Sequence, residues 1–389
     1  MRPLKTTLPF LNSRGMPLRQ LAPFAQSLEA NGVDFFWTYD QLTFLTPLSL
    51  WTPEHTPLAK EMPDLDSFHD AFVACAVASA ATSNLGVLIG GTDATRRGPA
   101  ELLQSMLSLA DLTDGQAICC VGAGEMKQIV PFGYKRAERL KRLEDTLQIV
   151  KELEECTGPI DYDGGVWQYR DAYIGCIRRH LPEFWTMGAG PRVIGLAGKY
   201  ADGFMTVAPG AATTPERFAD HVSEIKKSVA EAGRDPDDFG FGCMFLVFIH
   251  DDPNAIEAVM ESPVIKWYAA IAGRLNQADW AAEGIEPVLP LDWHYALDLL
   301  PCSVTPEEAE EVISQVTPEM VRKSFLVGTP EEVADQILPS VDAGMNLMAP
   351  ADLSIWGGQS AEELAAGHER SLKLNRLVKE AAKASVPVA

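Results

Sequence analysis

Short apolar runs alternate with longer stretches of helical period along most of this chain. The runs lie near positions 8, 35, 87, 119, 186, 205, 245 and 347 and are bounded by turn-forming residues, as buried strands are. Between them, apolar positions at helical spacing predict helices over 18–31, 99–111, 135–156, 214–232 and 361–382. Eight strand–helix units predict an α/β fold, a closed (β/α)8 TIM barrel, with a doubly wound parallel sheet as the rival.

Three long segments depart from this alternation. Residues 39–66 contain four prolines and no clear period, and a loop of this length beside a barrel is typical of an active-site wall. Residues 158–180 look irregular. Residues 262–318 combine tryptophans and prolines without a strand pattern, which predicts an inserted, largely helical lid. We therefore expect one barrel domain over residues 1–389 that carries two insertions.

Two helix starts carry recognisable capping residues. Ser67 precedes an alanine-rich run that ends at Ala81, so we expect it to cap that helix. Thr329 stands three residues before Glu332, which is the spacing of a capping box. Both motifs indicate where the chain leaves a loop and enters a helix.

Composition and charge exclude several classes of partner. The chain has 389 residues, with 32 Lys+Arg against 54 Asp+Glu and a net charge of −22, so phosphate backbones and anionic membranes are poor partners. The longest run of apolar and small residues, 71–81, is far shorter than the ~20 residues of a membrane span. Seven cysteines without a CxxC pair fit a reducing compartment. We expect a cytoplasmic protein that acts on a small molecule.

Candidate chemistry follows the strands, because the C-terminal ends of barrel strands meet at one mouth. Asp40 follows the second strand, Gly90-Gly91-Thr92 the third, Gly122-Ala123-Gly124-Glu125 the fourth and Gly188-Ala189-Gly190 the fifth. Glycine turns that lead into helices expose backbone N–H groups, which bind phosphate or admit a flat ring. A glycine turn also serves as a plain strand-to-helix connection, so each turn has both interpretations.

The two carboxylates have more than one interpretation. Asp40 is a general acid or base, an anchor for substrate or cofactor, or a cap for its own loop. Glu125 stands beside apolar neighbours, where burial would raise the pKa of a carboxyl group toward a value useful for proton transfer. Its alternative is to cap the next helix.

Other polar residues point less clearly to chemistry. The stretch 127–142 has six basic residues and one acid and is either a site for an anionic tail or a solvated face, and Arg96 and Arg97 have the same two interpretations. The seven histidines show no metal-ligand spacing, so we expect no metal site. Cys119 and Cys120 fit an inert core, and the lid tryptophans fit either a substrate pocket or core packing.

Taken in order, seven segments resemble the luciferase-like oxidoreductases, a family of barrels that bind flavin mononucleotide (FMN) or the deazaflavin coenzyme F420. The resemblance covers nearly the whole chain and rests on residues 32–37 with Asp40, 85–86, 121–125 followed by 131–133, 190–192, 197–203, 232–236 and 327–332. Within the family, the loop 37–48, the turn 96–99 and the lid with Trp280 and Pro290 are most similar to the phthiodiolone ketoreductases.

The resemblance implies a cofactor ring at the barrel mouth, a non-prolyl cis peptide behind it near Ile89-Gly90, and a homodimer. It implies catalytic roles for Glu125 and Asp40 and substrate contacts for Trp37, Gln41 and Trp267. The cofactor-binding residues that it implies are Asp40, Ile89, Gly90, Gly91, Thr92, Gly124, Glu125, Gln128, Gly188, Ala189 and Gly190.

The sequence departs from the family at two places. Gln41 stands where the sugar-phosphate dehydrogenases have a histidine after the strand-two aspartate, and 209–212 lacks their phosphate-binding lysine, so a sugar phosphate is not the expected substrate. The first hypothesis is an F420-dependent oxidoreductase that transfers hydride between the deazaflavin C5 and a carbonyl or activated double bond. The alternatives are an FMN-dependent monooxygenase and a barrel that binds a deazaflavin without catalysis.

Overall fold

Eight parallel strands close into a barrel in the computed structural model, which describes residues 2–357 and 361–384. They are β1 (Lys5–Phe10), β2 (Phe35–Thr38), β3 (Gly86–Asp93), β4 (Ala117–Gly122), β7 (Glu183–Met187), β8 (Gly203–Ala208), β9 (Gly240–Ile249) and β11 (Leu347–Asp352). Their order is β9-β11-β1-β2-β3-β4-β7-β8, and pairing of β8 with β9 closes the barrel. All eight predicted strands are confirmed, and closure excludes the doubly wound sheet. The predicted domain also includes residues 1, 358–360 and 385–389, which lie outside the described residues.

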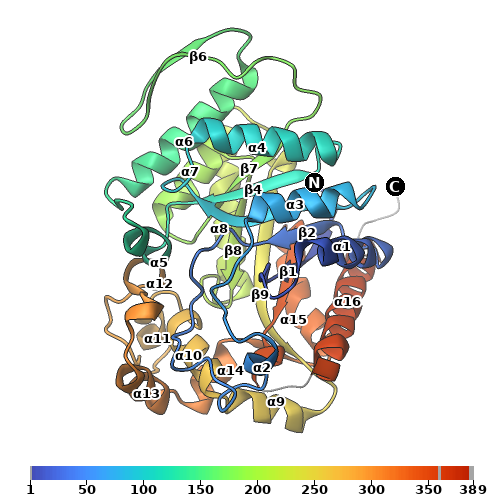
Figure 1. Ribbon diagram of the computed structural model, residues 1–389, viewed down its shortest axis with the longest axis vertical. Helices are drawn as coiled ribbons and strands as arrows, with labels where there is room; N and C mark the ends of the chain where they lie inside the picture. The colour runs from blue at the N-terminus through green and yellow to red at the C-terminus, as the bar shows by residue number, and fades with distance from the viewer. Residues whose placement is uncertain (1, 358–360, 385–389) are drawn as a thin grey trace.

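Helices surround the barrel as the alternating pattern predicts (Figure 1). The outer layer consists of α1 (Leu21–Ala30), α3 (Ala71–Ala80), α4 (Pro99–Leu112), α6 (Arg139–Glu155), α7 (Pro191–Tyr200), α8 (Pro215–Glu231), α15 (Pro330–Asp342) and α16 (Ala361–Ala384). Within the described ranges, none of the helices combines the length and apolar character needed to span a membrane.

One of the large side chains that fill the barrel interior packs opposite several glycines. Trp185 on β7 is 1 % exposed, and a Cβ atom on Gly203, Gly240 or Gly242 would crowd its indole ring. These strand glycines therefore make room for a bulky core residue. The centre of the barrel is therefore a packed core, and a polar site is expected at the ends of the strands.

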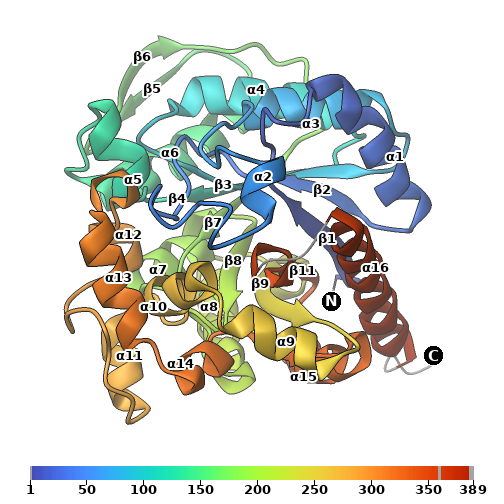
Figure 2. The same ribbon diagram turned by 60° about the horizontal axis from the view of Figure 1, so that its bottom comes forward.

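The predicted lid is confirmed as helical. It contains α10 (Pro263–Ala272), α11 (Gln277–Ala282), α12 (Tyr295–Asp298) and α13 (Pro306–Gln315), preceded by α9 (Pro253–Met260) and followed by α14 (Pro318–Lys323). The loop 39–66 is irregular except for α2 (Leu58–Glu61). Loop and lid share one apolar cluster, and Figure 2 shows α2 and the lid helices in front of the barrel.

Three local predictions need correction, and one short strand was not predicted. Asp70, and not Ser67, caps α3, because its Oδ1 accepts from the N–H groups of Phe72 at 2.9 Å and Val73 at 3.1 Å. The segment 158–180 contains an antiparallel hairpin of β5 (Ile160–Asp163) and β6 (Gln168–Ala172), whose exposed polar strands hide the apolar alternation of a sheet. The helix predicted from 135 begins at Arg139, and the short strand β10 (Leu326–Gly328) extends the sheet beside β9.

The capping box before α15 is confirmed. The Thr329 hydroxyl accepts from the Glu332 N–H at 3.3 Å, and the Glu332 carboxylate accepts from the Thr329 N–H at 2.9 Å. Two N–H groups that would otherwise lack partners at the helix start are thereby satisfied.

Candidate active site at the barrel mouth

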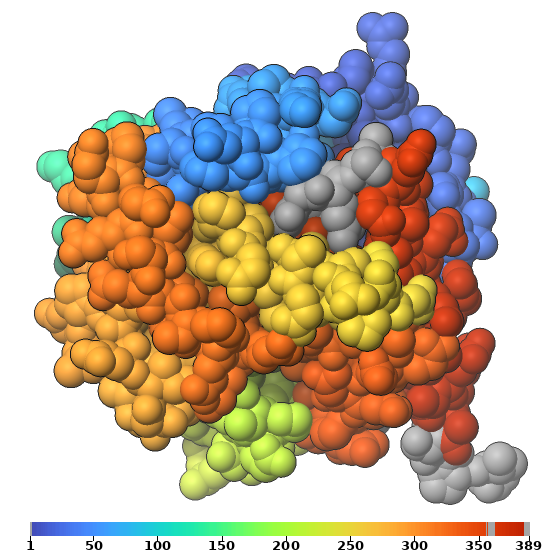
Figure 3. All heavy atoms as spheres, turned by 90° about the horizontal axis from the view of Figure 1, so that it is seen from below, coloured from blue at the N-terminus to red at the C-terminus, as the bar shows by residue number. Residues whose placement is uncertain are grey.

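The C-terminal ends of the strands open toward the loop 39–66 and the lid. Figure 3 looks onto this end of the molecule, where atoms of the loop, of α9 and α10 and of the lid meet. Trp267 of α10 joins the lid to the loop 39–66, because its indole N–H donates to the Leu45 carbonyl at 2.8 Å. Trp267 is 3 % exposed and braces the loop, and its predicted contact with substrate stays a prediction.

A non-prolyl cis peptide joins Gly90 to Gly91 at the end of β3, one residue after the position that the family resemblance implies. A Cβ on Gly90 would overlap the Trp37 indole, and one on Gly91 would lie 2.7 Å from the Cys120 carbonyl oxygen. Trp37 is fully buried and donates its indole N–H to the Gly90 carbonyl at 2.9 Å. Trp37 therefore positions the peptide, and its predicted contact with substrate stays a prediction.

The neighbouring residue Ile89 faces away from the mouth. Its side chain is fully buried in the apolar layer between the barrel and the outer helices. Side chains alternate along a strand, so Ile89 and Gly90 point to opposite faces. Only the backbone of Ile89 is available to a ligand in the mouth, and its predicted contact with the cofactor stays a prediction.

Asp40 is the centre of a buried polar network. Its carboxylate accepts from Arg97 Nε at 2.8 Å and Nη2 at 2.9 Å and from the Thr92 hydroxyl at 2.6 Å, and Arg96 Nη2 lies 3.4 Å away. Burial alone would raise the pKa of Asp40, but the hydrogen bonds and charges of the two arginines outweigh it and the pKa is lowered. Asp93 also pairs with Arg96.

This network fixes the roles of several predicted residues. Asp40 is a fully engaged carboxylate, which suits an anchor and not an acid or base. The Thr92 hydroxyl donates its hydrogen bond to the Asp40 carboxylate. Arg96 and Arg97 are neither a solvated face nor a site for an anionic tail, because both guanidinium groups bind buried or capping carboxylates. Sequence pattern alone missed this pairing across more than 50 residues.

Glu125 follows β4 and lies against a buried lysine. Its Oε2 is 2.8 Å from Lys127 Nζ, and its side chain is 34 % exposed, so it does not occupy the apolar pocket that the sequence suggested. Lys127 is 1 % exposed and also donates to the Thr43 carbonyl at 3.2 Å. It therefore does not belong to a surface patch. Gly124, with φ +95°, makes the left-handed turn that presents Glu125.

Gln128 holds the loop 39–66 to the fourth strand end. It lies on the short helix α5 (Met126–Ile129), accepts the Leu42 N–H at 2.7 Å and donates to the Thr43 carbonyl at 2.6 Å. Its amide is thus hydrogen-bonded within the protein, and its predicted contact with the cofactor stays a prediction. Gln41 differs, because its buried Oε1 has no hydrogen-bond partner among the described residues.

Three tyrosines that the sequence pattern did not single out lie at the same mouth. Tyr39 comes from the end of β2, Tyr268 from α10 and Tyr295 from α12. Burial raises the pKa of each of them, and the neighbouring Glu125 carboxylate contributes at Tyr295. At neutral pH all three hydroxyls are therefore protonated donors. The sequence did not indicate that these tyrosines lie together, because they are far apart along the chain.

The turn Gly188-Ala189-Gly190 is accessible and leads into α7. Gly190 is the N-cap of α7, no side chain caps the helix, and a Cβ there would meet open space. The first N–H groups of such a helix carry partial positive charge and bind anions. Arg136 and Arg139 lie near α12, and burial and then the charge of Arg139 lower the pKa of Arg136.

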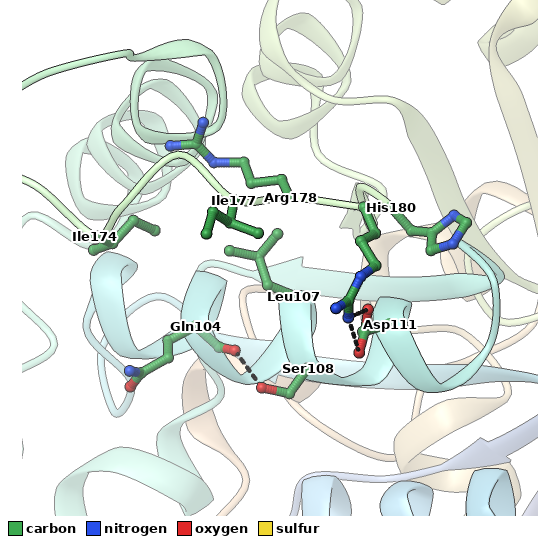
Figure 4. Close-up of a pocket in the computed structure, with 9 residues that line it drawn as sticks. Gln104, Leu107, Ser108, Asp111, Ile174, Ile177, Arg178 and His180 are labelled. Atoms are coloured by element: carbon green, nitrogen blue, oxygen red, sulfur yellow. Dashed lines mark hydrogen bonds and ion pairs between the residues drawn. The ribbon is translucent and has the colours of Figure 1, made fainter.

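Two surface grooves lie at the other end of the molecule from the lid (Figure 1). One of about 270 Å³ runs between α4 and residues 174–180 (Figure 4). One of about 600 Å³ adjoins it under β6. In the first groove Arg179 pairs with Asp111 at 2.9 Å and Arg178 donates to backbone carbonyls, so its charges are already matched. The mouth remains the candidate active site.

The model of one protein family, described as luciferase-like monooxygenase, matches residues 5–347. The chain belongs to the luciferase-like monooxygenase family. Among its curated relatives, a phthiodiolone/phenolphthiodiolone dimycocerosates ketoreductase of Mycobacterium kansasii is 27% identical over 323 residues, which cover 82% of this chain and 86% of the relative.

Solved structures support the barrel fold of this luciferase-like protein. An F420-dependent secondary alcohol dehydrogenase in complex with an F420–acetone adduct superposes with a TM-score of 0.69 at 19% identity, covering 97% of this chain and 99% of that chain. The oxygenating constituent of 3,6-diketocamphane monooxygenase from Pseudomonas putida, in complex with FMN, gives a TM-score of 0.62 at 17% identity, covering 100% of both chains.

Proposed function

We propose that this protein is a coenzyme F420-dependent oxidoreductase that transfers hydride between the deazaflavin C5 and a carbonyl carbon or activated double bond of an organic substrate. The observation that carries the proposal is the glycine turn before α7, where a Cβ on Gly190 would meet open space and no side chain caps the helix, so its first N–H groups can bind a phosphate-bearing cofactor. The ketoreductase name of a curated relative supports the reaction class.

Residues at the mouth fit such a cofactor. Gly90 and Gly91 would support the ring, and the uncapped N-terminus of α7 after Gly188-Ala189-Gly190 would hold the phosphate. Arg136 and Arg139, for which no ion pair within 4 Å is found among the described residues, would meet the anionic tail. When bound, the deazaflavin supplies or accepts the hydride, and the protein supplies orientation and polar contacts.

The ion-paired Glu125 and the anchored Asp40 take different parts in this proposal. Glu125 would hold the polar edge of the ring, with Lys127 at 2.8 Å fixing its carboxylate. Asp40 would keep the second and third strand ends in place through Thr92 and Arg97. Glu125→Gln is expected to weaken F420 binding by about tenfold, the effect of losing one charge-assisted hydrogen bond.

Titration of the purified protein with F420 and with FMN, followed by quenching of cofactor fluorescence, tests the proposal. We expect saturable quenching of F420 with micromolar or tighter affinity and no saturation with FMN. Tight binding of FMN without binding of F420 would refute it. Oxidation of reduced F420 in single turnovers by ketones, enones and quinones then tests catalysis, and a protein that binds F420 but oxidises it with none of them would be a binding barrel.

An FMN-dependent monooxygenase is the second candidate. The observation that favours it is the likeness of the whole barrel to an FMN-bound oxygenating subunit. A deazaflavin has carbon in place of the flavin N5 and does not react usefully with oxygen, so the cofactor decides the reaction class. Oxygen consumption by the reduced FMN complex in the presence of ketone would support this candidate.

We also propose that the protein works in the cytoplasm as a homodimer, joined at the face that carries the two grooves. Ile177 is 92% exposed there, and Leu112, Leu181 and Tyr173 are exposed beside it. Light scattering coupled to size-exclusion chromatography tests the assembly, with Ile177→Asp expected to give monomers.

A further inference from the structure

Tyr39 reaches across the opening of the barrel. It lies two residues after Trp37, on the same inward face of the second strand, and its hydroxyl donates to Met244 Sδ on β9 at 3.5 Å. Strands β11 and β1 separate β9 from β2 in the barrel order, so the tyrosine side chain spans the lumen. The register that pairs Thr38 with Ile89 brings Tyr39 beside Gly90 and its cis peptide.

The two carboxylates near this place are already engaged. Asp40 is bound by Thr92 and Arg97, and Glu125 is ion-paired with Lys127. Gln41 carries an amide, which does not exchange a proton with substrate at neutral pH. By contrast, the acceptor of the Tyr39 hydroxyl is a thioether sulfur, a weak partner that a carbonyl oxygen readily replaces.

Two further hydroxyls lie close to Tyr39. They belong to Tyr268 and Tyr295. Burial raises the pKa of both hydroxyls, the charge of Tyr39 adds to this at each of them, and the Glu125 carboxylate adds to it at Tyr295. At neutral pH both hydroxyls are therefore protonated, so the surroundings of a phenolate at Tyr39 include hydrogen-bond donors.

We propose that the Tyr39 hydroxyl is the proton donor when this protein reduces a carbonyl compound. This inference rests on the proposed function, in which reduced F420 is the hydride donor. The carbonyl carbon gains hydride and the C=O π pair moves to oxygen, which takes the Tyr39 proton to give the alcohol. The phenolate then recovers a proton from water. In the reverse direction Tyr39 accepts the proton of the alcohol.

Tyr39→Phe in the full chain tests this role, because it removes only the hydroxyl and keeps the ring. The expected result is a drop in single-turnover ketone reduction of about 10²- to 10⁴-fold, the usual contribution of a positioned acid. The fluorescence-derived Kd for oxidised F420 and the thermal midpoint are expected to stay unchanged. Tyr134→Phe, at an exposed ring outside the mouth, is the matched control and is expected to behave as the unsubstituted protein.

A second acceptor separates proton transfer from a structural effect. Protonated 2-methyl-1-pyrroline is an iminium ion that becomes a neutral amine on gaining hydride and needs no further proton. We expect Tyr39→Phe to reduce it as fast as the unsubstituted protein does. Equal losses with ketone and iminium, an undiminished ketone rate, or a selective ketone loss in Glu125→Gln but not in Tyr39→Phe would overturn the assignment.

The same measurements distinguish failure of this inference from failure of the proposed function. An unsubstituted protein that binds no F420, or that reduces no carbonyl compound with it, overturns both. An unsubstituted protein that reduces ketones while Tyr39→Phe does so equally well overturns only the role of Tyr39.

Discussion

Replacing Asp40 by Asn tests how far one buried carboxylate holds the mouth together. Asp40 is 6 % exposed and makes a two-pronged ion pair with Arg97 at 2.8 and 2.9 Å. Removing one partner of a buried pair costs about 3–5 kcal/mol. Arg97 keeps Asp70 at 2.9 Å, and Arg96 keeps Asp93, so neither arginine is left unpaired and we expect a smaller loss of about 2–3 kcal/mol.

The loss has a measurable size in thermal unfolding. At about 2.1 cal/mol/K per residue, unfolding of a 389-residue chain has an entropy of about 0.8 kcal/mol/K, so the midpoint falls by about 3 °C. Urea titration followed by circular dichroism gives the free energy of unfolding directly. Asp163→Asn is the matched control, because its ion pair with Arg170 is exposed and its loss leaves the midpoint unchanged.

The effect of Asp40→Asn on the free energy of unfolding is expected to depend on pH. The pKa of Asp40 is lowered in the folded protein, so its stabilisation is present above the unfolded pKa of about 3.9 and is lost as pH falls through the lower folded value. The difference between Asp40→Asn and the unsubstituted protein is therefore largest near pH 7 and shrinks in acid. A difference below about 0.5 kcal/mol at pH 7, within the range of ordinary surface changes, would refute the reasoning.

Further outcomes follow from the same structure. Gly91→Ala forces a Cβ against the backbone of β4 and is expected to cost about 1–3 kcal/mol in urea unfolding, whereas Gly195→Ala, which meets open space inside α7, is expected to stabilise by up to about 1 kcal/mol. Burial raises the pKa of Asp352 to about 6, so its contribution to stability is lost as pH rises through 6, and Asp352→Asn is expected to gain about 1–2 kcal/mol at pH 7 but little at pH 4. Trp267→Phe removes an indole hydrogen bond to the loop 39–66 and is expected to speed tryptic cleavage within that loop, and an unchanged cleavage rate would count against the bracing role.

The sequence predicted the barrel because its evidence is local. Each strand is a short apolar run and each outer helix an apolar stripe, and these periods depend on neighbouring residues along the chain. The hairpin in 158–180 was not predicted, because most residues of its strands are not buried and show no apolar alternation. Asp70 was not predicted as the cap of α3, because a cap is defined by backbone geometry.

Sequence position also located the candidate site, but not its partners. Because barrel strands end at one mouth, the places of Asp40, Gly90 and Glu125 along the chain were enough to group them. Their charge state and hydrogen bonds depend on contacts between residues far apart in the chain. Arg97 binds Asp40 across 57 residues, and Trp37 binds the Gly90 carbonyl across 53.

The sequence by itself determined the βα repeat, the positions of the strand ends, the long loop and the lid, because hydrophobic period and turn chemistry are properties of adjacent residues. Tertiary structure alone decided which side chains are buried or paired within the protein and which remain available to a ligand. In the folded chain Trp37 and Trp267 are buried and Glu125 is paired with Lys127. The Tyr39 hydroxyl donates to the sulfur of Met244, which is 205 residues away in the sequence. Burial and pairing arise only when distant segments pack, and they decide which groups can act.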